Sequence, residues 1–522
     1  MKKFLLLSVF HSACCMLHSQ TTFQRSLDLG QDDEFLCGIN TSDGGYLACG
    51  SSTVPFGGTA VKLNSNGAVT WAKTVGGTKI SDAVQTSWGG YYLAGVNTVS
   101  SNLNFYLCKL DGNGTLLWSH TYGKTSEADE LHSMVRTPDG GVIMSGYGDT
   151  INGAGFRPIA YVVKTDSNGT VQWEKYIGGG TGGEEFYMAK PVSNGGYLCA
   201  GYTGSYGSSV GTESYVVRLD ANGNIIRTNV FGHNNRFDRI YDFVEFPGNS
   251  FYFTGDAAYT STTDNLFLAK TDTSGNFLWQ KNYEEYHGGL SLVKTSDNNL
   301  LIGGYYISQA LGLYNDSYLF KTDTSGTISW AREIGAAGVD DKMYNVIETP
   351  DAGFFMTGSN YGATAGRGSW FVKTDANGSS GCRDSAVTIP VTLLPIASTT
   401  GGNAAPAYYG SSFVVGQLTA NYTPITFCSG PTDVPQFQIS GYGFLVFPNP
   451  VRDELKIVAD ENSEVSIVDM EGRVVLQKKI SAGENMIDVS GLAEGVYEIV
   501  KVKVNVKRDE NGVEVRKLVI SR

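Results

Sequence analysis

The chain has 522 residues, of which 66 are glycine, 29 tyrosine and only 14 proline, and charged residues make up 17% of it. This length exceeds that of one ordinary domain, so several domains or an array of repeats is expected. The abundance of glycine and aromatic residues indicates a turn-rich β protein rather than a helical or disordered one. The formal net charge of -13 argues against a nucleic-acid partner, because phosphate binding needs a basic surface.

The N-terminus has the features of a secretory signal peptide. Two lysines precede the apolar run Phe4 to Phe10, and small and polar residues follow it. We expect cleavage after Ser19, so that residues 1–19 are removed. The alternative is a lipoprotein signal at Cys14 or Cys15, but His11 stands where such a signal has leucine. No later segment has the roughly 18 apolar residues that span a bilayer, so we expect no transmembrane segment.

One short motif recurs seven times between residues 62 and 382. Each copy starts with a basic residue and ends with glycine, and five copies have tryptophan four residues later. The copies are Lys62–Gly67, Lys109–Gly114, Lys164–Gly169, Arg218–Gly223, Lys270–Gly275, Lys321–Gly326 and Lys373–Gly378, and the tryptophans are Trp71, Trp118, Trp173, Trp279 and Trp330. The copies therefore repeat every 47 to 55 residues.

The period contains four alternating apolar runs, separated by glycine-containing turns, as between Asp129 and Ile177. Such runs predict four β-strands. Four-stranded units of this length are typical of a β-propeller, in which each blade covers the face of the next. Seven copies predict a seven-bladed propeller over residues 20–380, in an all-β protein.

The motif predicts the hairpin between the third and fourth strands, with Asp holding the turn and Gly adopting positive φ. A calcium loop would need a carboxylate at its twelfth position, where Tyr122, Ile177 and Phe231 stand instead. We therefore expect a turn, with the following tryptophan ring packed between blades. This arrangement resembles the tryptophan-docking repeat of quinoprotein-type propellers, and the resemblance implies the fold alone. Kelch propellers have a similar period and also a glycine doublet. In kelch repeats the doublet follows the aromatic strand, whereas here it precedes that strand, as in Gly195-Gly196-Tyr197, so we do not assign the chain to the kelch family.

The seventh copy lacks a fourth strand, because no tryptophan strand follows Gly378. The N-terminal residues Phe23–Gly30 align with Trp330–Gly335 of the sixth copy. We predict that a strand over residues 22–29 completes the last blade and closes the ring. Closure of this kind removes free sheet edges, which otherwise favour aggregation.

Residues 381–440 are rich in Thr, Ser, Gly and Pro and predict a linker with room for short strands. Six cysteines remain after signal-peptide cleavage. Four of them fall in predicted strands, where cysteine commonly acts as a small buried hydrophobe: Cys37, Cys49, Cys108 and Cys199. Cys382 and Cys428 bracket the linker and predict a disulfide in an oxidising compartment, since their spacing fits no zinc site.

Short alternating strands and turns follow Phe444 and predict a small Ig-like β-sandwich over residues 441–522. Four sequence features stand out: Phe447, Pro448, Asn449 and Pro450 at its start, Gly472 in a turn, Gly495 and Tyr497 in a second turn-strand element, and Lys517 at the start of the last strand. They resemble the type A C-terminal sorting domain of the type IX secretion system of Bacteroidetes. The resemblance implies type IX machinery as partner, export across both membranes, and a destination at the cell surface or in the medium. The alternative is an ordinary Ig-like binding module.

Five carboxylates occupy equivalent positions where the innermost strands of five blades begin: Asp33, Asp129, Glu184, Asp238 and Asp341. In the structural interpretation they hold backbone N–H groups of the turns between blades. In the functional interpretation they form a cation or sugar-hydroxyl site at the channel mouth, with Ca²⁺ as the candidate ion. Long loops rich in Gly, Ser, Tyr and Asn lie on the same face and suit recognition.

Catalysis has little support, because no metalloprotease helix, nucleophile elbow or phosphate-binding loop is found in the sequence. We expect an exported, monomeric binding or adhesion module for a glycan or a protein, with no cofactor. The alternative is a glycan-degrading enzyme that uses carboxylates at the mouth, since a glycosidase needs only two of them.

Overall fold

The computed structural model describes residues 20–520 except 29–31, 54–55, 100, 125–127, 150–156, 179–181, 207–210, 233–236, 249, 259–263, 273–274, 284–288, 309–313, 336–338, 362–366, 382–383, 388, 390, 394–396, 400–403, 406–417, 420–422, 430–443, 448–452, 460–461, 470–472, 494 and 504–512. The chain divides into two compact units, Met1–Gly430 and Pro431–Arg522. The predicted signal peptide lies outside the described residues.

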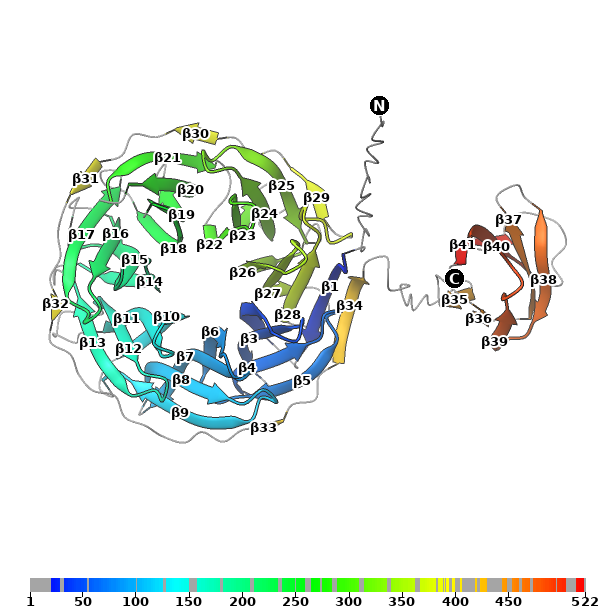
Figure 1. Cartoon of the computed structure of the whole chain (residues 1–522), viewed down its shortest axis with the longest axis horizontal. Coiled ribbons are helices and arrows are strands. Elements are labelled where there is room, and N and C mark those ends of the chain that lie inside the picture. The colour runs from blue at the N-terminus through cyan, green and yellow to red at the C-terminus, as the bar shows by residue number, and fades with distance from the viewer. Residues whose placement is uncertain are drawn as a thin grey trace, which may run out of the picture. The chain divides into compact units, whose positions relative to one another are not determined.

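Seven antiparallel sheets stand around a common axis in the first unit (Figure 1), which confirms the predicted seven-bladed propeller. From the axis outward, the blades are β2 (Glu34–Asn40), β3 (Tyr46–Thr53), β4 (Phe56–Leu63) and β5 (Val69–Thr74); β6 (Lys79–Gln85), β7 (Tyr91–Val99), β8 (Asn102–Leu110) and β9 (Leu116–Tyr122); β10 (Asp129–Arg136), β11 (Val142–Asp149), β12 (Pro158–Thr165) and β13 (Val171–Ile177); β14 (Glu184–Pro191), β15 (Tyr197–Thr203), β16 (Glu213–Leu219) and β17 (Ile225–Gly232); β18 (Asp238–Phe246), β19 (Ser250–Ala258), β20 (Asp264–Thr271) and β21 (Phe277–Tyr283); β22 (Gly289–Lys294), β23 (Leu300–Ser308), β24 (Tyr314–Thr322) and β25 (Ile328–Ile334); and β26 (Asp341–Glu348), β27 (Phe354–Tyr361), β28 (Arg367–Thr374) and β1 (Phe23–Asp28).

The N-terminal strand β1 completes the seventh blade, as predicted. It pairs antiparallel with β28, with Phe23 opposite Lys373 and Leu27 opposite Ser369. The first and last parts of the repeat region are therefore joined within one sheet, and the ring is closed by backbone hydrogen bonds.

The recurring motif forms the predicted hairpin. In blade 2 the Asp111 carboxylate accepts backbone N–H bonds from Asn113 and Thr115 at 2.9 and 2.7 Å, and Gly114 adopts φ of 75°. A Cβ atom on Gly114 would lie only 2.8 Å from the ring of Trp71 in blade 1. The same contact joins Trp118 to Gly169, Trp173 to Gly223, Trp279 to Gly326 and Trp330 to Gly378, and Phe23 of β1 lies against Gly67. Each aromatic ring thus docks on the turn glycine of the next blade.

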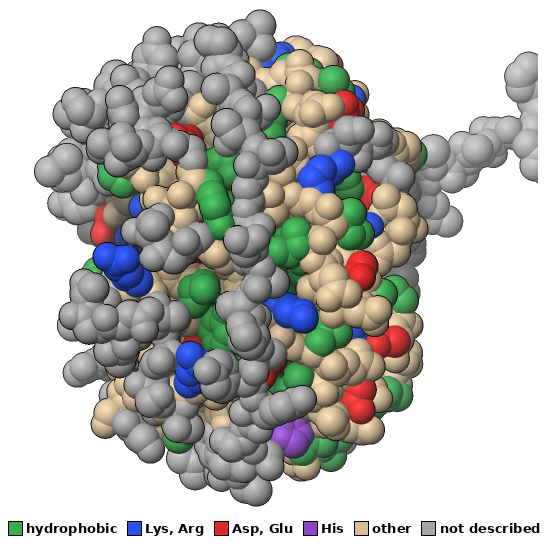
Figure 2. Space-filling view, turned by 90° about the vertical axis from the view of Figure 1, so that its left-hand side faces the viewer, with side chains coloured by type: hydrophobic (Ala, Val, Ile, Leu, Met, Phe, Trp, Pro, Cys, Tyr) green, Lys and Arg blue, Asp and Glu red, His purple; other side chains and the backbone are tan. Residues whose placement is uncertain are grey.

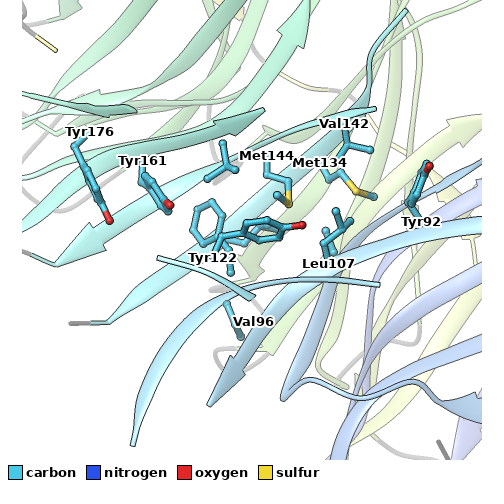
Figure 3. Packing of buried hydrophobic residues seen from close by; sticks show 13 residues of the cluster. Tyr92, Val96, Leu107, Tyr122, Met134, Val142, Met144, Tyr161 and Tyr176 are labelled. Atoms are coloured by element: carbon cyan, nitrogen blue, oxygen red, sulfur yellow. The ribbon is translucent and has the colours of Figure 1, made fainter. Parts of the chain in front are cut away.

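Aromatic and aliphatic side chains fill the space between neighbouring blades. Figure 3 shows this packing between blades 2 and 3, where Tyr122, Met134 and Met144 lie among aliphatic residues. The Tyr122 hydroxyl donates to the carbonyl of Gly169 at 2.7 Å, so the one polar atom of this buried side chain bonds to the next blade's turn.

The described part of the segment predicted as a linker contains short strands. It adds a fifth strand to the outer edge of six blades (Figure 1): β29 (Asp384–Ala386) on β25, β30 (Val391–Leu393) on β21, β31 (Ala397–Thr399) on β17, β32 (Ala404–Ala405) on β13, β33 (Leu418–Thr419) on β5 and β34 (Thr423–Ser429) on β1. We call residues 384–429 the belt. It meets blades 6, 5, 4 and 3, then blade 1, and ends on blade 7. Cys382 and the side chain of Cys428, the predicted disulfide, lie outside the described residues.

The second unit consists of two small sheets. One contains β35 (Phe444–Phe447), β36 (Glu454–Ala459) and β39 (Gly483–Asp488), and the other contains β38 (Val474–Ile480), β37 (Ser463–Asp469), β40 (Gly495–Lys503) and β41 (Val513–Ile520). Strands of both sheets contribute to one buried core, including Leu455, Ile467 and Ile487. Tyr497 lies in this core and donates a hydrogen bond to the carbonyl of Ala493 at 2.9 Å.

Candidate functional site

The five carboxylates predicted at the channel mouth are all buried, with exposed fractions of 0–2%. Each stands at the start of an inner strand and faces the end of the preceding blade. The backbone N–H of Lys124 donates to the Asp129 carboxylate at 2.9 Å. A Cβ on Gly178 or Gly335 would lie 2.4 or 2.3 Å from the carboxylate oxygen of Glu184 or Asp341. These contacts support the structural interpretation of the five residues.

Their role in binding a cation or a sugar hydroxyl stays a prediction. Within the described ranges, no group of three or more His, Cys, Asp or Glu side chains is placed to hold a metal ion. The five carboxylates each belong to a different blade, and none of them lines the cavity at the axis.

A β-bulge occurs at the same place in all seven inner strands. The bulged residues are Leu36, Ser81, His132, Tyr187, Tyr241, Leu290 and Tyr344. A bulge re-aims the side chain of the extra residue. All seven residues line a cavity of about 270 Å³ at the axis of the ring.

Three adjacent blades contribute aromatic rings to this cavity, and we call His132, Tyr187 and Tyr241 the aromatic arc. The ring centroids of His132 and Tyr187 are 4.6 Å apart, and those of Tyr187 and Tyr241 are 4.8 Å apart with the rings at 68°. The Tyr241 hydroxyl donates to Asp256 at 2.8 Å. The arc is therefore a continuous aromatic surface fixed by ring contacts and a hydrogen bond.

Charged side chains stand at the first or second position of six inner strands. Five of them, Glu34, Glu130, Glu185, Arg239 and Lys342, directly follow the buried carboxylates, and Lys79 is the first residue of β6. The Lys79 ammonium lies 2.9 Å from the Glu130 carboxylate, and His132 Nε2 lies 3.2 Å from Glu185. The hydroxyls of Tyr147 and Tyr202 donate to Glu130 and Glu185 at 2.9 and 2.7 Å. The mouth thus carries both signs of charge, interleaved with tyrosines.

These contacts determine the protonation states of the side chains at the mouth. Burial opposes ionisation of Glu130, but the charge and hydrogen bond of Lys79 outweigh it and lower the pKa of Glu130. The hydrogen bond and charge of His132 likewise lower the pKa of Glu185 against the effect of burial. Burial raises the pKa of Tyr344 to about 12. At neutral pH the mouth therefore presents ionised carboxylates and neutral phenols.

A deeper layer of polar side chains links the blades around the cavity. The Asp82 carboxylate of blade 2 accepts a bond from the N–H of Met134 in blade 3 at 3.0 Å. Asp242 of blade 5 accepts one from Leu292 of blade 6 at 2.9 Å. Asn345 of blade 7 accepts one from Gly38 of blade 1 at 3.0 Å, across the ring closure. These side chains hold the inner strands in place.

The cavity is lined by other residues of the inner strands than the five carboxylates that the sequence singled out. Successive side chains of a strand point to opposite sides. Asp129 points toward the preceding blade, whereas Glu130 and His132 reach the mouth. Each of the five buried carboxylates is followed one residue later by a charged residue and three residues later by a bulged residue. Counting one and three residues on from each carboxylate would therefore have identified both sets of side chains. The central parts of the long loops on this face, such as 150–156, 207–210 and 309–313, lie outside the described residues.

Comparison with known families concerns the second unit. Residues 445–521 match the model of the family described as a secretion system C-terminal sorting domain. This domain is a type IX secretion sorting domain. It indicates export across the outer membrane to the cell surface or the medium, and it implies engagement with the type IX machinery. In the described residues no helix has the length and hydropathy to cross a membrane.

Two solved structures are similar to the chain. One is PorZ, an essential surface component of the type IX secretion system of Porphyromonas gingivalis, with 10% identity, a TM-score of 0.35, and coverage of 92% of this chain and 69% of that one. The other is Sqt1 from Chaetomium thermophilum, with 11% identity, a TM-score of 0.41, and coverage of 70% of this chain and 90% of that one. Neither similarity is close enough to indicate a function. No curated protein matches the sequence.

Proposed function

We propose that this protein is an exported binding module whose propeller holds a glycan at the channel mouth. The observation that carries the proposal is the aromatic arc, flanked by ionised carboxylates and tyrosine hydroxyls. Aromatic faces accept the apolar side of a ligand, while tyrosine hydroxyls and carboxylates bond to its polar groups. A sugar ring presents both kinds of surface.

The size of the cavity favours a small part of a ligand. At about 270 Å³ it lies just below the range of roughly 300–1,000 Å³ that is usual for small-molecule pockets. A terminal sugar of a chain fits this volume better than a long oligosaccharide does. A side chain from a partner protein is the second ligand class, and the same experiment distinguishes the two.

The outer rim offers less support for a binding surface. On the side of the ring around β13 and β17, hydrophobic, basic and acidic side chains are interspersed (Figure 2). Single exposed apolar residues such as Ile226, with 61% exposed, are normal on soluble proteins. The mouth is therefore the better candidate site.

The ionisation state of the mouth favours binding over glycoside hydrolysis. A glycosidase needs one carboxylic acid whose pKa is raised so that it can protonate the leaving oxygen. The pKa values of Glu130 and Glu185 are lowered instead. Asp129 and Glu184, the carboxylates of the enzymatic alternative, are buried.

A glycan array with the protein comprising residues 20–430 tests the proposal. We expect retention of one glycan class by the wild type and loss of the signal in Tyr187→Ala. Trp88→Ala is the matched control, because Trp88 is an exposed aromatic residue beyond the opposite end of an inner strand, with 50% exposed. Equal retention by wild type and Tyr187→Ala would contradict a mouth site. A reducing-sugar assay on the retained glycan reports hydrolysis, and release of sugar would favour the enzyme.

A further inference from the structure

Two cysteines oppose each other in the first hairpin of blade 1. Cys37 on β2 is the direct partner of Cys49 on β3 in the antiparallel register. Both are thiols in the structure, and their exposed fractions are 3% and 0%. Cys37 directly follows the bulged residue Leu36 and lines the axial cavity.

The equivalent pair in blade 3 shows how close two such side chains come. Ser133 and Ser145 occupy the same two strand positions, and their Oγ atoms are 2.8 Å apart. Directly opposed residues of an antiparallel pair have Cα atoms about 4.5–5.5 Å apart. This range lies within the roughly 4.4–6.8 Å spanned by disulfides. The blade geometry therefore brings the two sulfur atoms together without a movement of the backbone.

We propose that Cys37 and Cys49 form a disulfide in the exported protein. The sorting domain sends the chain to an oxidising environment, where paired thiols are commonly oxidised. Each thiol loses its proton, the two sulfurs form one S–S bond, and the two electrons reduce the disulfide of a thiol oxidoreductase to a dithiol. The third cysteine of the same core, Cys108, is opposite Leu93 and Ser119 rather than another cysteine.

The bond forms before the ring closes. Burial and the neighbouring Cys49 side chain raise the pKa of the Cys37 thiol in the folded protein, and thiol exchange needs the thiolate and access. Cys49 is only twelve positions after Cys37 in the sequence, so the hairpin brings the two cysteines together while the chain is still open. The disulfide then fixes the register of β2 against β3 at the wall of the cavity.

Peptide mapping of the wild-type protein tests the proposal directly. Protein collected after export is denatured with N-ethylmaleimide and no reductant, then digested. We expect the Cys37 and Cys49 peptides to be linked, with a mass about 2 Da below that of the two free peptides, and the Cys199 peptide to be alkylated. Alkylation of both Cys37 and Cys49, or a link from Cys49 to Cys108, would overturn the proposal.

A second measurement uses variants. Reductant should lower the Tm of the wild type by more than that of the variant carrying both Cys37→Ala and Cys49→Ala. Cys199→Ala is the matched control, because Cys199 is equally buried in the second strand of its blade and lies opposite Ala189 and Val217. It should keep the wild-type response. A double variant with an undiminished response would contradict the disulfide.

Discussion

At the scale of single residues, the docking of each aromatic ring on a turn glycine explains why glycine and an aromatic residue recur together in the repeats. Gly114 has a positive φ, which alanine tolerates poorly, and it also lies under Trp71. Gly89 in the same blade has φ of 89° but no atom within 4 Å of a Cβ. The two positions separate the backbone effect from the docking effect.

We predict that Gly114→Ala lowers the free energy of unfolding by more than Gly89→Ala does. The backbone conformation alone costs about 1–3 kcal/mol in either variant. The added methyl group at position 114 must also displace the Trp71 ring. Denaturant unfolding of the two variants measures the difference, and equal losses would show that the ring contact contributes nothing.

Ion pairs between a buried lysine and an exposed aspartate, on the face opposite the mouth, tie the two hairpins of a blade together. The Lys164 ammonium, 1% exposed, lies 2.8 Å from Asp139 and also bonds to the carbonyl of Thr165. Burial of Asp139 opposes its ionisation, but the hydrogen bond from Lys164 outweighs this effect and lowers the pKa to about 2. Asp43 has the same arrangement with Lys62, and its pKa is also about 2.

The lowered pKa values predict a loss of stability in acid. A carboxylate whose pKa falls on folding stabilises the protein above its unfolded pKa of about 3.9. That contribution is lost as the pH falls from about 4 to about 2. Asp139→Asn should cost at most about 1 kcal/mol at neutral pH, because solvent screens the exposed carboxylate and Lys164 keeps its bonds to Thr165 and Gln172, and it should make the acid limb shallower. Unfolding curves across this pH range check both effects, and a variant as acid-sensitive as the wild type would contradict the assignment.

At the scale of elements, the pairing of the belt strands with the blades is the feature that the sequence did not reveal. The belt strands are two to seven residues long and pair through the backbone with the outer edges of blades. Strands this short need no alternation of apolar and polar residues, so the sequence of residues 384–429 resembles that of a linker. By contrast, β1 was predicted correctly because Phe23 and the residues after it repeat the side-chain pattern of a fourth strand.

The end of the belt covers the closing strand. β34 pairs with β1 along its outer side, with Phe23 opposite Ser429 and Asp28 opposite Thr423, while β28 pairs with its inner side. The strand that closes the ring is therefore bonded on both edges. Without β34 its outer edge is left unpaired, and unpaired edges favour association.

We predict that a protein ending at residue 383 has a lower Tm than one ending at residue 430 and forms larger oligomers. Removal of residues 20–30 should destabilise the ring further, since β1 itself is lost. The protein ending at residue 430 is itself the control, because it lacks only residues 431–522, which form a separate unit. Thermal unfolding with size-exclusion chromatography provides the measurement. Identical melting of the proteins ending at 383 and 430 would mean that the belt does not stabilise the ring.

At the scale of the whole molecule, the two units have separate tasks. The sorting domain carries the export information, and the propeller is the cargo. Fusion of residues 441–522 to a periplasmic reporter should bring the reporter to the surface or medium of a host with type IX secretion. Tyr497→Ala, which removes a buried ring of the domain's core, is expected to reduce that export. A reporter retained in the periplasm would contradict the assignment.

The central claim is that the propeller binds its ligand at the channel mouth. The most direct measurement is a calorimetric titration of the array-selected glycan into the wild type, Tyr187→Ala and Trp88→Ala, with melting temperatures recorded for each. Loss of a central aromatic contact typically costs at least about 2 kcal/mol, which is more than tenfold in Kd. We predict this weakening for Tyr187→Ala and an unchanged Kd for Trp88→Ala. A folded Tyr187→Ala protein that binds as tightly as the wild type would contradict the claim.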